Sequence, residues 1–205
     1  MPIFATAYLP PIAYIAQMAQ FENVTIEQME TFHKQTYRNR TIILTANGLL
    51  PLIVPTIKIN GNHTLTRDIG ITYNENWNIK HWRAIESAYN SSPYFLYYRD
   101  GIEKILMTPY KRLIDLNQAL LSYLLKKLKI KCTTNFSENY LTPETTEKDF
   151  RDCFSIKGNY TTEQFPEYNQ VFITKFPFQP NISILDLLFN LGPDSKEYLM
   201  QLKVC

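Results

Sequence analysis

An Asn-Gly dipeptide at positions 47 and 48 separates two apolar runs, TIILTA and LLPLIV, and restricts the fold more than any other feature of the sequence. Asn-Gly is preferred in a two-residue type I′ turn, so we expect the two runs to pair as an antiparallel hairpin. Pro51 and Pro55 cannot donate ladder hydrogen bonds. They place the second arm at the edge of a sheet or at a bulge.

Short apolar segments predict further strands. Residues 3–9 are typical of a strand that stops at Pro10, and the helix formers that follow predict a strand, tight loop and helix unit. We expect the strand that ends at Leu9 and the strand that starts at Thr41 to share one sheet. Other strands are expected at residues 23–28, 69–73 and 170–176.

Apolar residues at helical spacing predict several amphipathic helices. The clearest pattern lies at residues 112–130, where leucines recur on one face and lysines follow at the carboxyl end. Helices are also expected at residues 77–90 and 93–107. A short last helix should begin with Ser183 and Asp186 as a capping box and stop at Gly192.

These elements indicate an α/β protein: a single domain with a mixed sheet, an early Asn-Gly hairpin and several packed amphipathic helices. A chain of 205 residues with 45% hydrophobic content suits one core. Residues 132–169 are polar, rich in Thr and weakly periodic. We expect them to form a long loop or lid region within a single domain of residues 1–205.

Charge and cysteine content restrict the partners and the compartment. The chain has 21 basic and 19 acidic residues, a net charge of +2, so it lacks the electrostatic footprint of a nucleic-acid-binding protein. No apolar run has the length of a transmembrane helix, and the first residues lack the basic region of a signal peptide. The three cysteines show no CxxC spacing and are odd in number. They favour reduced thiols in the cytoplasm over a disulfide framework or a zinc site.

The sequence motifs of the common cofactor-dependent enzymes are absent. We find no GxGxxG, no Walker loop, no GxSxG and no HExxH. The sequence therefore indicates no cofactor and no metal. Any bound anion must be held by side chains.

The basic segment, residues 34–40 (KQTYRNR), places three cations in seven positions. If it is extended, one face carries Lys34, Thr36, Arg38 and Arg40. Such a row could hold a diphosphate or paired carboxylates. The alternative is a solvated loop whose arginines pair with nearby acidic residues.

His81 lies beside Trp82 at the border of the apolar helix face, four residues after Trp77. Histidine titrates near neutral pH, so a histidine near an anion-binding edge suits proton transfer to a sugar hydroxyl or amine. The alternative is a structural histidine bonded to a backbone carbonyl. His33 and His63 are expected in loops without neighbours at metal-ligand spacing.

Four segments, in this order, resemble the WbqC-like family of bacterial proteins, especially its Bacteroidetes-type branch: YLPPIAYIAQM, KQTYRNRTIILTANGLLPLIVP, WNIKHWRAIESAYNSSPYFLYY and SILDLLFNLGP. The resemblance implies a context of surface polysaccharide and O-antigen synthesis, without a secure reaction. The family's aromatic-proline opening falls on Tyr8 and Pro10. Its basic segment falls on residues 37–40, and its Trp-x-x-x-His helix on Trp77 and His81.

Two functions follow as hypotheses. The first is a cytoplasmic transferase acting on a nucleotide- or phosphate-linked sugar, or on its amino or acyl substituent, with an anionic small molecule such as a nucleotide sugar as ligand. The second is a non-catalytic binding or scaffold protein of the same pathway. His81 is the catalytic candidate, and we expect it to meet the opening loop and the basic segment at one cleft. The substrate-binding candidates are Tyr8, Lys34, Tyr37, Arg38, Asn39, Arg40, Trp77 and Trp82.

Overall fold

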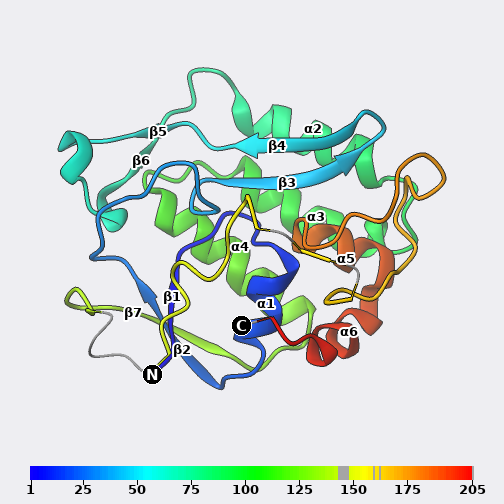
Figure 1. The fold of residues 1–205 in the computed structure, drawn as a ribbon. Coiled ribbons are helices and arrows are strands. Elements are labelled where there is room, and N and C mark those ends of the chain that lie inside the picture. Colours follow the sequence, from blue (N-terminus) through cyan, green and yellow to red (C-terminus); the bar gives the residue numbers. More distant parts are fainter. Residues whose placement is uncertain (143–147, 159, 162, 205) are drawn as a thin grey trace.

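A three-stranded parallel sheet lies near the amino terminus. The computed structural model describes residues 1–142, 148–158, 160–161 and 163–204 (Figure 1). Strand β1 (Ile3–Ala5) pairs with β2 (Asn23–Glu27), which pairs with β7 (Thr133–Phe136). The buried helix α1 (Ile12–Met18) connects β1 to β2, which confirms the predicted strand, loop and helix unit. Because the strands are parallel, their carboxyl ends lie at one edge of the sheet.

The predicted hairpin is confirmed, although its turn differs from the expected type. Strand β3 (Arg40–Thr45) pairs antiparallel with β4 (Gly48–Ile53) in a two-stranded sheet, so β4 is an edge strand, as its proline indicated. Thr45 pairs with Gly48, so Ala46 and Asn47 form the loop. A type I′ turn requires positive φ at both loop residues. Neither Ala46 nor Asn47 has a positive φ, and the residue that does is Gly48, at 99°. The type I′ prediction is therefore wrong.

A second antiparallel pair extends the hairpin side of the molecule. Strand β5 (Thr56–Ile57) pairs with β6 (Gly70–Ile71), which confirms the strand expected near residues 69–73. Two 3₁₀ helices, η1 (Gly61–His63) and η2 (Thr66–Asp68), lie between these strands along the chain.

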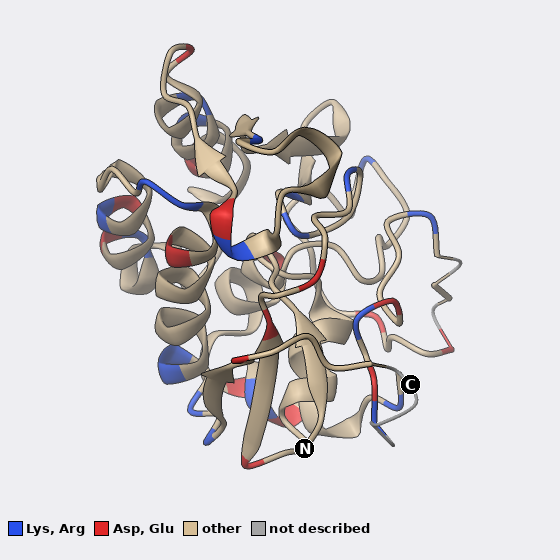
Figure 2. Ribbon diagram, turned by 90° about the vertical axis from the view of Figure 1, so that its left-hand side faces the viewer, with Lys and Arg blue, Asp and Glu red and all other residues tan. Residues whose placement is uncertain are grey.

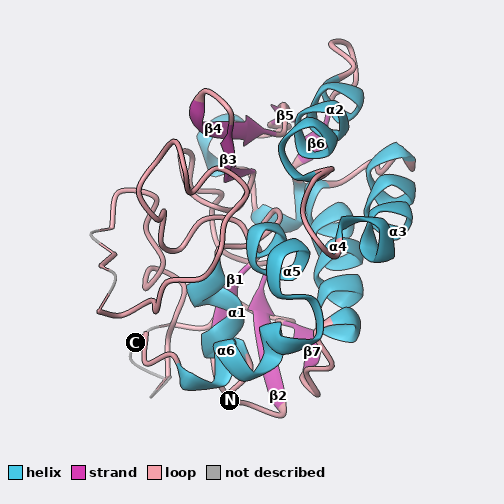
Figure 3. Ribbon diagram, turned by 90° about the vertical axis from the view of Figure 1, so that its right-hand side faces the viewer, coloured by secondary structure: helices cyan, strands magenta, loops and turns pink. Residues whose placement is uncertain are grey.

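Three longer helices form a layer beside the strands (Figure 3). They are α2 (Trp77–Tyr89), α3 (Phe95–Met107) and α4 (Leu113–Lys127), as the periodicity predicted. Helix α3 packs against both α2 and α4. The face of α4 that is completely buried carries the leucines of the predicted stripe, Leu113, Leu116, Leu120 and Leu124.

The last part of the chain folds into two short helices. Helix α5 (Ile184–Leu191) begins where the Ser183 Oγ accepts a hydrogen bond from the Leu185 N–H at 3.4 Å. The Asp186 carboxylate bonds elsewhere, so only the Ser183 half of the capping box is confirmed. Gly192, with a φ of 53°, ends α5 as predicted. The 3₁₀ helix η4 (Gly192–Asp194) and helix α6 (Ser195–Gln201) follow without having been predicted.

Two expectations about the strands are wrong. Residues 170–176 form turns, because the Gln170 side chain bonds the backbone of Gln179 through Oε1 at 2.8 Å and Nε2 at 3.0 Å and closes a loop. The segments around Leu9 and Thr41 do not share a sheet. The Thr41 hydroxyl donates to the Leu9 carbonyl at 2.7 Å, so a side chain makes the expected connection.

The region 132–169 is mostly loop, as expected, but its first residues form β7. Residues 143–147, 159 and 162 of the predicted lid lie outside the described residues. The buried side chains of the sheets and helices form one continuous hydrophobic cluster, so the fold is a single α/β domain.

Two properties bear on the environment of the chain. Among the described helices, none combines the length and the hydropathy needed to cross a bilayer. Cys132 is a free, partly buried thiol, as expected for that residue. Cys205 lies outside the described residues.

Candidate functional site

His81, the predicted acid-base residue, lies in the core beside Tyr8. The Tyr8 hydroxyl and His81 Nδ1 are 2.9 Å apart, and both side chains are buried. The Trp77 ring meets the His81 ring edge-on, with 5.0 Å between centroids. Burial lowers the pKa of His81 to about 4, although a hydrogen bond with the Ile53 backbone raises it. His81 is therefore neutral at pH 7 and joins α2 to the opening loop and β4.

The three segments expected to converge do meet, but through packed contacts. The Tyr8 N–H donates to the Tyr37 carbonyl at 2.9 Å, and Tyr8 contacts Trp77 and His81 on α2. None of the cavities described below is lined by Tyr8, Trp77 or His81. The surroundings of His81 fit the alternative of a structural histidine bonded to a backbone carbonyl. A catalytic role of His81 stays a prediction.

The basic segment is a series of turns and not an extended strand, so the expected alternation of its side chains is wrong. Gln35 has a φ of 60°, which reverses the chain direction. Lys34 is exposed, Arg38 is buried and Arg40 is half-buried at the start of β3. Neither Lys34 nor Arg40 forms an ion pair with a carboxylate of the described residues.

Arg38 is held by a buried carboxylate. Its Nε donates to Glu30 Oε1 at 2.7 Å and its Nη2 donates to Glu30 Oε2 at 2.9 Å. Its carbonyl oxygen accepts from Asn117 Nδ2 at 2.8 Å. Arg38 therefore fits the alternative in which an arginine of the basic segment pairs with a nearby acidic residue. A role of Arg38 in substrate binding stays a prediction.

The remaining binding candidates occupy separate surroundings. Asn39 Nδ2 donates to the Val54 carbonyl at 3.0 Å, which fixes the chain after the hairpin. Trp82 stacks on Phe95 in the interface between α2 and α3. Tyr37 is nearly buried but lines a cavity that contains polar side chains.

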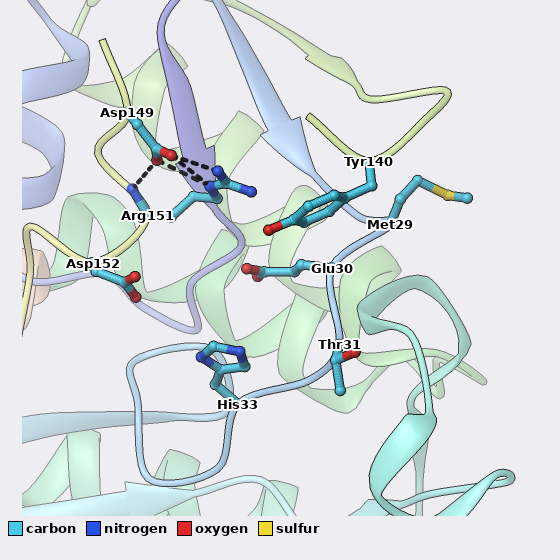
Figure 4. A pocket seen from close by; sticks show the side chains of 8 residues that line it. All are labelled: Met29, Glu30, Thr31, His33, Tyr140, Asp149, Arg151 and Asp152. Atoms are coloured by element: carbon cyan, nitrogen blue, oxygen red, sulfur yellow. Dashed lines mark hydrogen bonds and ion pairs between the residues drawn. The ribbon is translucent and has the colours of Figure 1, made fainter. Parts of the chain in front are cut away.

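The strand-end pocket is a cavity of ≈ 300 Å³ next to the carboxyl end of β2 (Figure 4). Glu30 and its neighbours follow β2 directly, and a parallel bridge between Asp149 and Ile3 carries the chain along β1 toward Arg151. Two segments more than a hundred residues apart thus meet at one edge of the sheet. The pocket is lined by Met29, Glu30, Thr31, His33, Tyr140, Asp149, Arg151 and Asp152.

Ion pairs fix the inner wall of this pocket. Arg151 Nε lies 2.9 Å from Asp149 Oδ1, and its guanidinium lowers the pKa of that carboxyl group below its usual value. Glu27, completely buried behind the pocket, accepts from the Ser137 hydroxyl at 2.6 Å and from the Met29 N–H at 2.7 Å. These groups are already saturated by protein partners, so they shape the pocket.

The rim of the pocket carries the groups that remain accessible. His33 and Asp152 are exposed, and Figure 4 shows their side chains on two different loop segments beside the cavity, with the Glu30 carboxylate pointing toward the same space. Asp152 forms no ion pair within the described part of the chain. The site can therefore offer a carboxylate acceptor and an imidazole to a ligand.

The local charge of the pocket is negative. Among the described lining residues, Glu30, Asp149 and Asp152 carry carboxylates and Arg151 carries a guanidinium. Elsewhere the signs are mixed, as the interspersed basic and acidic residues in Figure 2 show. Within the described residues, no group of three or more His, Cys, Asp or Glu is arranged to hold a metal ion. A polar ligand with an amine or hydroxyl groups suits this end better than a phosphate.

The strand-end pocket was missed by the sequence analysis. Glu30 and His33 could have been found, because both follow a predicted strand and ligands of open α/β sheets bind beyond the carboxyl ends of strands. Asp149, Arg151 and Asp152 lie in the weakly periodic region 132–169. Only the bridge to β1 brings them here, and no local pattern signals it.

The fold and the pocket define an α/β protein with a polar cavity at the edge of a small parallel sheet. The WbqC-like protein family matches residues 6–156 and 143–198, and the chain belongs to this family. It is similar to the "Uncharacterized protein Rv1507c" of Mycobacterium tuberculosis (strain ATCC 25618 / H37Rv), with 28% identity over 223 residues and 96% of each chain covered. No solved structure matches the chain.

Proposed function

We propose that the chain is a transferase acting on the amino or acyl substituent of a nucleotide- or phosphate-linked sugar in surface polysaccharide biosynthesis. The observation that carries the proposal is the strand-end pocket, where His33 faces carboxylates beyond the carboxyl end of a parallel strand. Open α/β sheets bind their ligands at this edge. Membership of the WbqC-like family supports the polysaccharide context through the resemblance described above.

The charge of the pocket sets the orientation of the ligand. An amine or hydroxyl group of the sugar enters between His33 and Asp152, because the carboxylates there attract a positive or donating group. The phosphate end stays outside the pocket. Lys34 and Arg40 are the cations of the basic segment without a carboxylate partner in the described structure, so they remain available to an anion.

Proton transfer is assigned to His33. As the sugar amine attacks the carbonyl carbon of an acyl donor, a C–N bond forms, the bond from that carbon to the donor's leaving group breaks, and the leaving group departs with the electron pair. His33 accepts the proton that the amine loses. Asp152 holds the amine in place by accepting a hydrogen bond. We prefer His33 to His81 for this step because His33 lines a cavity, whereas His81 is buried.

The second candidate is a non-catalytic binding protein of the same pathway. It is favoured by the absence of the common catalytic motifs from the sequence and by the neutralised arginines, which leave the pocket without a strong electrophilic group. Both candidates use the strand-end pocket. They differ in whether a bound sugar is changed.

Thermal-shift screening with amino-sugar nucleotides, alone and with acyl donors, tests the proposal. A ligand at a hundred times its dissociation constant stabilises the fold by about 2.7 kcal/mol. We expect a hit for an amino sugar and a mass change when donor and acceptor are combined. His33→Ala should abolish the product while retaining binding, and Asp152→Asn should weaken binding.

His63→Ala is the matched control, because His63 is also an exposed loop histidine but lies on η1, outside the pocket. Binding without product would favour the scaffold alternative. A product formed equally by His33→Ala would overturn the assignment of the base.

The cytoplasmic location is part of the proposal. Nucleotide sugars are its expected ligands, and an odd number of cysteines without CxxC spacing suits a reducing compartment. Cell fractionation followed by thiol labelling tests this location.

A further inference from the structure

The Tyr37 pocket is a second cavity, of ≈ 210 Å³, that shares no lining residue with the strand-end pocket. Two aromatic rings, Tyr37 and Tyr160, and two amide side chains, Gln179 and Asn181, contribute to its wall. Ile42 on β3, Leu49 on β4 and apolar residues of two loops complete it, and none of its described lining residues is charged. Its volume is below the roughly 300–1,000 Å³ of pockets for drug-sized ligands, so it suits a single ring.

Asn181 fixes one part of the wall. It is 3% exposed, and its Oδ1 accepts from the Ala13 N–H at 2.8 Å. Its Nδ2 has almost no accessible surface, and a hydrogen bond joins the Asn181 side chain to the Tyr160 hydroxyl. Asn181 therefore holds the Tyr160 ring in place and is not itself exposed to a ligand.

The tyrosines add flat apolar faces and a free hydroxyl. Burial raises the pKa of the Tyr37 hydroxyl, so it is neutral. Within the described residues this hydroxyl makes no hydrogen bond, and it is not sealed from the cavity. The Tyr160 hydroxyl donates to the Ser155 carbonyl at 3.1 Å, which fixes its ring at the wall. A ligand ring with an apolar face can pack against the tyrosine rings, and polar groups around its edge can bond to the Tyr37 hydroxyl.

We propose that the Tyr37 pocket is a subsite for one neutral sugar ring, with the Tyr37 hydroxyl bonding to a ring hydroxyl or an acetamido oxygen. This inference rests on the proposed function, whose saccharide supplies the ring. A narrow cavity of ≈ 20 Å³ shares Tyr37 with this pocket and Arg151 with the strand-end pocket. The two sites are therefore neighbours that share no lining residue, and each is tested separately.

Ligand-observed NMR titrations with methyl glycosides of hexoses and N-acetylhexosamines test the subsite, with uridine and thymidine as nucleobase probes. We expect a glycoside to bind saturably and Tyr37→Phe to raise its dissociation constant about fivefold or more, the loss of one hydrogen bond. The melting temperature should stay unchanged, because the hydroxyl has no protein partner. Tyr97→Phe is the matched control, since Tyr97 is exposed on α3 outside the pocket.

Failure of the subsite and failure of the transferase are distinguishable. Glycoside binding that Tyr37→Phe weakens and His33→Ala leaves intact supports the subsite even if no product forms. The subsite is overturned if no glycoside binds, if only nucleosides bind, or if Tyr37→Phe and Tyr97→Phe behave alike, whatever turnover the strand-end pocket shows.

Discussion

The guanidinium of Arg38 forms a bidentate pair with the carboxylate of Glu30, and both side chains are buried. The carboxylate of this pair lines the strand-end pocket, whereas the guanidinium borders the narrow cavity that leads to the Tyr37 pocket. One ion pair thus forms the partition between the two candidate sites. Its planar geometry fixes the turn of the basic segment relative to the end of β2.

Arg38→Ala should destabilise the protein by about 3–5 kcal/mol, because removal of one partner leaves Glu30 as a buried, uncompensated charge. The free energy of unfolding in urea measures this effect. Lys34→Ala should change stability by less than about 0.5 kcal/mol, since Lys34 is an exposed cation of the same segment.

A double replacement separates the charge effect from packing. Arg38→Met combined with Glu30→Leu removes both charges and should recover most of the loss, because apolar pairs of similar volume substitute well for buried ion pairs. If Arg38→Ala is as stable as the parent protein, the pair contributes nothing, and Arg38 becomes a candidate for ligand binding again.

The fold was predictable where local patterns are strong. The leucine stripe of α4 and the apolar runs beside Gly48 carry their own periodicity and turn chemistry, and both elements exist as expected. Strand β7 was not predictable, because the residues 133–136, TTNF, have no apolar alternation and pair with β2 only through the backbone. Residues 170–176 show the reverse case, in which a strand-like composition is overridden by the side-chain bonds of Gln170.

The candidate site was only partly predictable. Sequence reasoning found Tyr37 and the closeness of Tyr8 to His81, because family-like segments point to them. It could not find that Glu30 neutralises Arg38, since an arginine in a polar segment is equally compatible with solvent. Whether Arg38 is solvated or paired depends on whether its side chain is buried. Its burial depends on contacts between segments that are distant in the sequence.

His81 should make the protein sensitive to acid. Its pKa falls from 6.5 to about 4 on burial, so below pH 6.5 the unfolded chain binds a proton that the folded chain does not. Its contribution to stability is complete above pH 6.5 and is lost as the pH falls toward 4, by about 3 kcal/mol in all. His81→Gln should remove this dependence. Urea unfolding from pH 4 to 7.5 checks it, and parallel curves for the two proteins would refute the assignment.

Asp186 should make the protein less stable as the pH rises, which is the opposite of the effect of His81. Burial raises its pKa from 3.8 to about 6, although the Tyr168 hydroxyl donates to it at 2.6 Å and lowers the value. The folded chain therefore holds a proton that the unfolded chain releases, and stability falls as the pH rises from 3.8 through 6, by about 3 kcal/mol. Asp186→Asn should gain stability relative to the parent protein across this window. Because the two effects oppose each other, His81→Gln combined with Asp186→Asn should show neither slope.

Gly192→Ala and Gly61→Ala form a matched pair that separates backbone strain from packing. Both glycines have a positive φ, 53° at Gly192 and 52° at Gly61, although the ψ of Gly192, −118°, lies outside the left-handed helical region. A Cβ at Gly61 meets nothing within 4 Å, whereas one at Gly192 would overlap the ring of Tyr94. Gly61→Ala should therefore cost only the left-handed strain of about 1–2 kcal/mol.

Gly192→Ala should lose that amount and about 1–3 kcal/mol more, because Tyr94 is not free to move away. The Tyr94 N–H donates to the Phe189 carbonyl at 3.0 Å and joins the start of α3 to α5. Displacement of the ring would strain that connection, so hydrogen exchange should accelerate at the end of α5 in Gly192→Ala and remain unchanged there in Gly61→Ala. Equal losses of stability in the two variants would mean that the Tyr94 ring can be displaced at no cost, and that backbone conformation alone selects glycine at the end of α5.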